Sequence, residues 1–140
     1  MSTDHNRLSL AHALGAREVI RPYLSPTPLR QYSSLNRHIG AEVYIKHENH
    51  NPTGTFKIRG GINLMHHLAG QGISGVTTYS TGNHGSSVAA SARMFGLTAT
   101  VVVPEGSNPL KVQAIKDAGA ELVEYGKDFE AAGRRPPNRP

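Results

Sequence analysis

The sequence predicts an α/β fold in three layers around a parallel sheet, and three observations predict it. Short strand patterns alternate with helix patterns along the second half of the chain, and such units form parallel sheets with right-handed crossovers. The run TATVVV, residues 98–103, is apolar enough for a strand that is covered on both faces. Small residues crowd the segment 85–90, which suits a helix lying close to that sheet.

The first half holds two predicted helices and one predicted strand. Residues 6–21 have a broken helical pattern with a weak point at Gly15, and the proline-rich segment 22–29 favours an extended connection. Residues 41–48 alternate and carry Val, Tyr and Ile, which predicts a strand. Apolar side chains recur at helical spacing over 56–67, and glycines follow, as they do at helix ends.

The second half repeats strand and helix. We expect strands over 75–80, 98–106 and 120–126, and helices over 84–96 and 108–119. In the last of these helices Asn108 is expected as the N-cap and Pro109 in the first turn. A further helix starts in residues 126–132 and stops at the prolines that follow. We interpret residues 131–140 as a disordered tail, and the unfinished helix as a sign of truncation.

Composition places the chain among globular proteins. It has 140 residues, 37% of them hydrophobic, and no apolar run approaches the roughly 20 residues that span a bilayer. It has no cysteine and hence no disulfide, and its polar start MSTDHNRLSL lacks the apolar core of a secretory signal. We therefore expect a cytoplasmic protein.

Charged and histidine side chains give no indication of a nucleic-acid or metal partner. The net charge is +5, but three arginines lie in the last eight residues, and without them twelve basic residues face ten acidic ones. The body of the chain is thus nearly neutral and has no basic stripe. His66 and His67 are adjacent and point to different helix faces, with no carboxylate three or four residues on.

One lysine occupies an unusual place. In the stretch HNPTGTFKIRGG, Lys57 follows a rigid proline–glycine turn and stands at the start of a predicted helix. The positive end of the helix dipole disfavours an ammonium group there and favours the neutral amine, which is the form that attacks a carbonyl carbon. Phe56 adds a flat apolar surface beside it. A Walker-type phosphate loop is a poor match, because Ile58 stands where that motif has Ser or Thr.

A polar turn follows the first predicted strand of the second half. The stretch YSTGNHGSS lies at the carboxyl end of a parallel strand, the edge where open α/β sheets bind ligands. Ser80, Thr81, Asn83 and His84 offer hydroxyl, amide and imidazole groups, and Gly82 lets the backbone approach a ligand. Free N–H groups at the helix start suit a carboxylate or a phosphate. A plain polar turn with Asn83 as the helix cap fits the pattern equally well.

Taken together, the two stretches resemble the fold type II pyridoxal-phosphate enzymes, most closely the threonine/serine dehydratases and their serine racemase relatives. The matching segments are KHENHNPTGTFKIRGG and STGNHGSSVAASARMFGLTATVVVPEG, and TPL and NPLKVQAIKDAGAELVEYG also fit. The resemblance runs from about Ser25 to Phe129. It implies a parallel sheet of the tryptophan synthase β-like class, here incomplete. Residues 1–73 would belong to the large cofactor domain and residues 74–130 would form the small α/β domain.

The resemblance also implies roles for single residues. Lys57 would bind the cofactor, pyridoxal phosphate, covalently, Phe56 would pack on the cofactor ring, and Asn83 would hydrogen-bond its 3′-oxygen. The loop that closes on the substrate carboxylate would comprise Ser80, Thr81, Gly82, Asn83 and His84. The implied reaction is an α,β-elimination, in which Lys57 removes the α-proton and the β-hydroxyl leaves. L-threonine or L-serine would become a 2-oxo acid and ammonia. A small amino acid is the expected partner, and the full-length form is expected to be a homo-oligomer.

Several alternatives stay open. Serine racemase relatives usually have a serine, a second acid or base, where this chain has Thr81, which retains a hydroxyl but adds a methyl group. A 3-hydroxyaspartate dehydratase or a β-replacement synthase would use the same cofactor, although TFKIRG favours the dehydratase group over the synthases. The resemblance places the glycine-rich phosphate loop downstream of residue 140. We therefore expect the 140 residues alone to bind the cofactor weakly, and a non-catalytic fragment is the last alternative.

Overall fold

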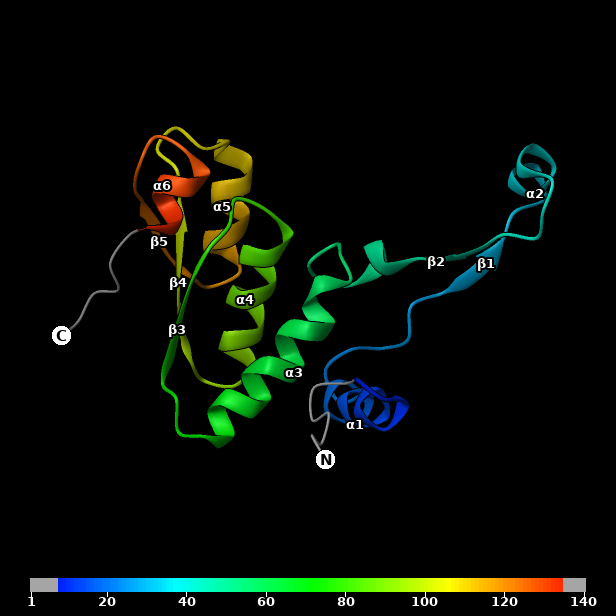
Figure 1. Cartoon of the computed structure of the whole chain (residues 1–140), viewed down its shortest axis with the longest axis horizontal. Coiled ribbons are helices and arrows are strands. Elements are labelled where there is room, and N and C mark those ends of the chain that lie inside the picture. Colours follow the sequence, from blue (N-terminus) through cyan, green and yellow to red (C-terminus); the bar gives the residue numbers. More distant parts are fainter. Residues whose placement is uncertain (1–7, 135–140) are drawn as a thin grey trace, which may run out of the picture.

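The computed structural model describes residues 8–134 of the chain (Figure 1). In chain order its elements are α1 (Leu10–Ile20), β1 (Leu29–Gln31), α2 (Ser33–Ile39), β2 (Tyr44–Lys46), the 3-10 helix η1 (Glu48–His50), α3 (Lys57–Gly70), β3 (Gly75–Tyr79), α4 (Asn83–Met94), β4 (Thr98–Val103), α5 (Pro109–Asp117), β5 (Glu121–Glu124) and α6 (Phe129–Gly133). Among these helices none is both long and apolar enough to cross a membrane. The alternation of strand and helix expected for the second half is confirmed.

Strands β3, β4 and β5 form a parallel sheet in that order, which confirms the predicted α/β fold. Because side chains alternate along a strand, Ala99, Val101 and Val103 of β4 point to one face of the sheet. They meet Val88 of α4 and Ile115 of α5 there, and all five side chains are buried. Helices α4 and α5 therefore cover this face and hold its core.

Helix α6 packs on the opposite face of the sheet and completes three layers (Figure 1). Its Phe129 ring contacts the ring of Tyr79 at the end of β3, with 4.9 Å between the ring centroids. The predicted disordered tail, residues 131–140, overlaps this helix. The start of that segment is helical because it packs against the sheet, and Ala132 is only 2% exposed there. Residues 135–140 lie outside the described residues.

Helix α3 packs along α4 and joins the first part of the chain to the sheet (Figure 1). The helices approach closely at Gly61, where an added Cβ would lie 2.6 Å from the Ser87 hydroxyl and 2.5 Å from the Ser91 hydroxyl. On the same helix, Ile58 and Ile62 are fully buried and pack against α1, the segment that follows it and α4. Small residues on α4 thus determine how near α3 lies to the sheet.

Strands β1 and β2 form a separate antiparallel ribbon with α2 at its far end, and this ribbon projects from the rest of the molecule (Figure 1). The sequence patterns did not indicate β1 or α2. A three-residue strand is too short to show alternation, and α2 is rich in Ser, Asn and His, which are weak helix formers. The strand expected over 41–48 shortens to β2, because the chain turns into η1 at Glu48.

Candidate functional site

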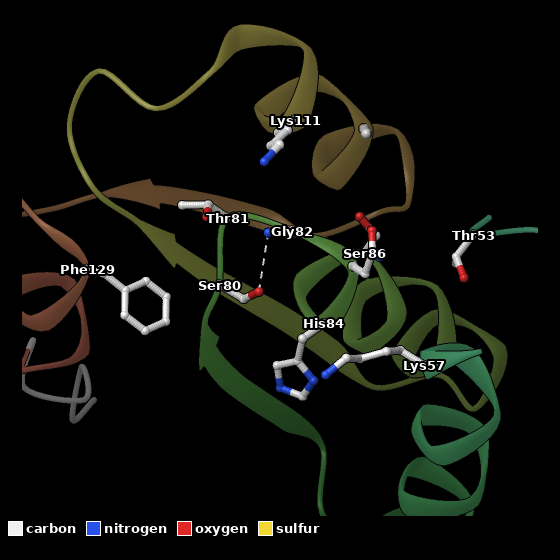
Figure 2. Close-up of a pocket in the computed structure, with 11 residues that line it drawn as sticks. Thr53, Lys57, Ser80, Thr81, Gly82, His84, Ser86, Lys111 and Phe129 are labelled. Carbon is white, nitrogen blue, oxygen red and sulfur yellow. Dashed lines mark hydrogen bonds between the residues drawn. The ribbon is translucent and has the colours of Figure 1, made fainter. Parts of the chain in front are cut away.

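A cleft of about 540 Å³ opens at the carboxyl end of β3, between the starts of α3, α4 and α5 (Figure 2). The polar loop 80–84 forms one part of its wall, and other lining residues are Lys57 of α3, Ser86 of α4, Lys111 of α5 and Phe129 of α6. Cofactor and substrate pockets typically measure some 300–1,000 Å³. The cleft lies at the sheet edge where the sequence predicts ligand binding.

Lys57 is the first residue of α3, as predicted, and Phe56 stands at the N-cap position without a side-chain cap. Figure 2 shows the Lys57 side chain reaching toward the ring of His84. The main chain of Lys57 is held from α4, because the hydroxyl of Ser87 donates a 2.7 Å hydrogen bond to its carbonyl oxygen. A lysine amine and the polar loop therefore share one cleft, although they come from distant segments of the sequence.

The loop before Lys57 is closed by an ion pair between Glu48 and Arg59. Arg59 Nε donates to Glu48 Oε2 over 2.7 Å, and Arg59 Nη2 donates to Glu48 Oε1 over 3.0 Å. Thr27 Oγ1 and Asn51 Nδ2 donate to the same carboxylate over 2.6 and 2.7 Å. The hydrogen bonds from Arg59, with smaller contributions from Thr27 and Asn51, lower the pKa of Glu48 to about 2, although burial opposes the shift.

The two residues of this ion pair lie on either side of Lys57 in the sequence: Glu48 precedes Lys57, and Arg59 follows it on α3. Asn51 extends the network, because its Nδ2 also donates to the carbonyl of Thr55 over 3.2 Å. The loop between β2 and α3 is thus fixed from inside. The sequence patterns did not reveal this network, and the one available signal was that Glu48 is the acidic residue nearest to Lys57 in sequence.

The polar loop is shaped by close contacts rather than by a helix cap. Gly82 is the N-cap of α4 and Asn83 is its first residue, so the alternative of Asn83 as the cap is wrong. Ser80 is largely buried, and its hydroxyl accepts a 3.3 Å hydrogen bond from the Gly82 N–H. A Cβ on Gly85 would lie 2.8 Å from the Ser80 carbonyl. With no side-chain cap, the first-turn N–H groups of α4 remain available to an anionic group.

The structure brings most of the predicted site residues together. The cleft is lined by Lys57, Ser80, Thr81, Gly82, Asn83 and His84. Phe56 is not among its lining residues: its side chain is 62% exposed and borders a neighbouring cavity, 6.0 Å from ring centroid to Lys57 Nζ. Lys111 and Phe129 line the cleft without having been predicted, since only the fold carries them there.

The cleft combines groups that suit carbonyl and amino-acid chemistry. Lys57 offers a primary amine, His84 an imidazole, and Ser80 and Thr81 hydroxyl groups. An amine can bond a carbonyl carbon or accept a proton, and the start of α4 suits a carboxylate. Among the described residues, no group of three or more His, Cys, Asp and Glu is placed to hold a metal ion.

Comparison with known proteins agrees with this chemistry. The family model described as "Pyridoxal-phosphate dependent enzyme" matches residues 20–135. The L-threo-3-hydroxyaspartate ammonia-lyase of Saccharomyces cerevisiae is 37% identical over 126 residues, which cover 87% of this chain and 39% of that protein. A biosynthetic L-threonine dehydratase of Pasteurella multocida is 37% identical over 136 residues, which cover 91% of this chain and 26% of that protein.

A solved structure shows the same fold. Serine racemase from Dictyostelium discoideum is similar with a TM-score of 0.82 and 33% identity, over 90% of this chain and 41% of that one. The chain thus spans 26% to 41% of the length of these three proteins. The match to the family model includes both the lysine stretch and the polar loop. The chain belongs to the family of pyridoxal-phosphate-dependent enzymes.

Proposed function

We propose that this chain is the lysine-bearing part of an enzyme that eliminates water from L-threonine or L-serine, after which hydrolysis of the resulting enamine gives a 2-oxo acid and ammonia. One observation carries the proposal: the amine of Lys57 and the loop 80–84 line the same cleft. An elimination of this kind needs a base at the α-carbon and a fixed site for the α-carboxylate. Lys57 would supply the base, and the loop 80–84 would supply the carboxylate site.

The residues of the cleft fit the reactive end of pyridoxal phosphate. The cofactor's aldehyde requires a lysine amine, and Lys57 supplies one in the cleft that also contains the predicted ring-binding residue Asn83. The volume of about 540 Å³ lies in the range of cofactor pockets. When bound, the cofactor supplies an electron sink for the negative charge that develops at the α-carbon.

The side chains of the cleft divide the remaining work. Lys57 Nζ would hold the cofactor and, once released by the substrate's amino group, would accept the α-proton. The N–H groups at the start of α4 would bind the α-carboxylate and orient the α C–H bond toward Lys57. Asn83 would hydrogen-bond the cofactor ring. The Ser87 hydroxyl holds the start of α3 at a fixed distance from α4. It would thereby fix the position of Lys57 relative to the carboxylate site.

A serine racemase is the second candidate. The likeness to the Dictyostelium discoideum enzyme supports it, and so does the presence of Thr81 in the cleft, since its hydroxyl offers a second acid or base. Two of the similar proteins are named for eliminations, and this favours the lyase. The proposal includes a cytoplasmic enzyme of amino-acid metabolism, homo-oligomeric in its full-length form. In it, residues 1–73 belong to a large cofactor domain and residues 74–130 form the small one.

Reductive trapping tests the proposal. The chain is mixed with pyridoxal phosphate and then with borohydride, and the labelled peptides are identified by mass spectrometry. We expect one dominant label on Lys57, lost in Lys57→Ala and kept in the control Lys116→Ala, which changes an exposed lysine outside the cleft. Formation of 2-oxo acid from threonine and serine is then measured. Labelling spread over the exposed lysines in wild type would contradict the proposal.

A further inference from the structure

We infer that Lys111 makes the cleft selective for a β-hydroxy amino acid whose side chain carries a second carboxylate. The inference rests on the elimination chemistry of the proposed function and departs from it in the substrate, because serine and threonine carry no second carboxylate. Lys111 lies in the first turn of α5 and lines the cleft. Sequence patterns assign it no role, and the mechanism above does not use it.

The direction of Lys111 is determined by the packing of α5. Ile115 is 1% exposed and anchors the helix in the core against Val101 and Val103, which sets the rotation of the helix about its axis. Lys111 and Ala114, almost one turn apart, then fall on the side that faces the cleft. Asn108 fixes the start of the helix, because its side-chain oxygen accepts a 3.0 Å hydrogen bond from the Leu110 N–H.

The charge of Lys111 has no partner among the described residues. The described salt bridges do not include it, and the residues that line the cleft include no Asp or Glu. An ammonium in the first turn of a helix is also disfavoured by the helix dipole, so the charge does not stabilise α5. An anionic group of a ligand would give the Lys111 charge a partner and would offset its unfavourable interaction with the helix dipole.

The position of Lys111 relative to the other cleft residues selects the group that it would bind. Figure 2 shows Lys57 reaching from α3 toward His84, while Lys111 reaches from α5 toward Thr81 and Gly82. In the proposed mechanism Lys57 serves the α-carbon, and the start of α4 serves the α-carboxylate. Lys111 would then bind a substituent of the substrate side chain that extends toward α5. The side chains of serine and threonine carry no charge, whereas a carboxylate on the β-carbon would make a charge-assisted hydrogen bond with Lys111.

Binding of small carboxylates to the cofactor-free chain tests this inference. The probes are acetate with one carboxylate, malonate and succinate with two, and inorganic phosphate, all at constant ionic strength. Dissociation constants are taken from the amide NMR shifts of Gly82 and Asn83. We expect at least one dicarboxylate to bind roughly fivefold or more tightly than acetate, the scale of a partly exposed ion pair.

Matched variants assign the effect to one side chain. Lys111→Gln should lose the dicarboxylate preference with acetate binding unchanged, and Lys111→Arg should keep it. Lys116→Gln removes the same charge from an exposed position of the same helix and should change nothing. Equal binding of acetate and both dicarboxylates in wild type, or no binding of any carboxylate, would overturn the inference. So would a preference that survives in Lys111→Gln.

The phosphate probe and the trapping experiment separate the remaining outcomes. If phosphate binds more tightly than the dicarboxylates and depends on Lys111, the lysine serves a phosphate group and the inference is wrong. Failure of the proposed function would instead be seen in the borohydride experiment, as the absence of a label on Lys57. A dicarboxylate preference that depends on Lys111 can therefore be scored whether or not Lys57 is labelled.

Discussion

The hydroxyl of Ser87 donates a 2.7 Å hydrogen bond to the main-chain carbonyl of Lys57, across 30 residues of sequence. This contact ties the first turn of α3 to α4, the helix that begins at the polar loop. It is the direct link between the two stretches on which the functional proposal depends. The geometry of the cleft is therefore sensitive to a side chain that does not line it.

Replacement of Ser87 by alanine should lower the free energy of unfolding by about 1 kcal/mol, the usual net contribution of one hydrogen bond. It should also slow the trapping of pyridoxal phosphate on Lys57, because the start of α3 is released from α4. Ser91→Ala is the matched control: Ser91 is buried on the same helix, and its hydroxyl has no hydrogen-bond partner among the described residues. Denaturant unfolding and the trapping rate are measured on both. Equal effects of the two changes would refute a special role for Ser87.

Gly61→Ala should destabilise the chain by roughly 1–3 kcal/mol, as other overpacked sites do. The new Cβ would lie 2.5–2.6 Å from two serine hydroxyls and 3.1 Å from the Ser87 carbonyl. Gly60→Ala, one residue earlier, meets nothing within 4 Å and should be neutral or stabilising by up to about 1 kcal/mol. Denaturant unfolding of each variant checks the contrast. A Gly61→Ala chain as stable as Gly60→Ala would show that α3 and α4 are less closely packed than described.

Glu48→Gln should lower the free energy of unfolding by roughly 1–3 kcal/mol at neutral pH, because it removes a charged acceptor that Arg59, Thr27 and Asn51 share. The effect should depend on pH. The pKa of Glu48 is lowered from 4.5 to about 2 by its hydrogen bonds with Arg59. A carboxylate whose pKa is lowered on folding stabilises the fold above its unfolded pKa, and loses that contribution as pH falls toward the folded value.

The difference in free energy of unfolding between wild type and Glu48→Gln should therefore be largest above about pH 5 and shrink between pH 4.5 and pH 2. Denaturant unfolding at a series of pH values measures it. Glu18→Gln is the control, since Glu18 pairs with Arg21 on the surface with 64% and 71% of the two side chains exposed. Exposed pairs contribute about 0–1 kcal/mol, so this variant should show little change at any pH. A pH-independent difference for Glu48→Gln would contradict the lowered pKa.

Asn108→Ala should destabilise the chain by about 1 kcal/mol, because it removes the side-chain cap of α5. Asn108→Asp keeps an oxygen acceptor at the cap and should restore most of this loss. Thermal unfolding compares the three chains. The same pair of variants checks whether a well-formed start of α5 matters for the binding of dicarboxylates by Lys111. Destabilisation of equal size in both variants would mean that the side-chain oxygen acceptor is not the source of the stabilisation.

Local patterns were enough to predict the parallel sheet, its flanking helices and the Asn108 cap. The run TATVVV predicts a strand that is covered on both faces, because branched apolar side chains stand next to one another in it. Asn108 before Pro109 is a complete local helix start. The same patterns placed Lys57 at the beginning of a helix. They missed β1 and α2, whose short and polar sequences carry no period to detect.

The sequence by itself determined which side chains could do chemistry: an amine at Lys57, and hydroxyl, amide and imidazole groups over residues 80–84. Only the tertiary structure decided that these groups share a cleft, that Phe56 lies outside it, and that Lys111 faces into it. The Glu48–Arg59 ion pair and the Ser87–Lys57 hydrogen bond likewise join distant residues. The physical reason is that spacing along a chain specifies local conformation and burial, whereas contacts across a fold depend on how the helices and strands pack.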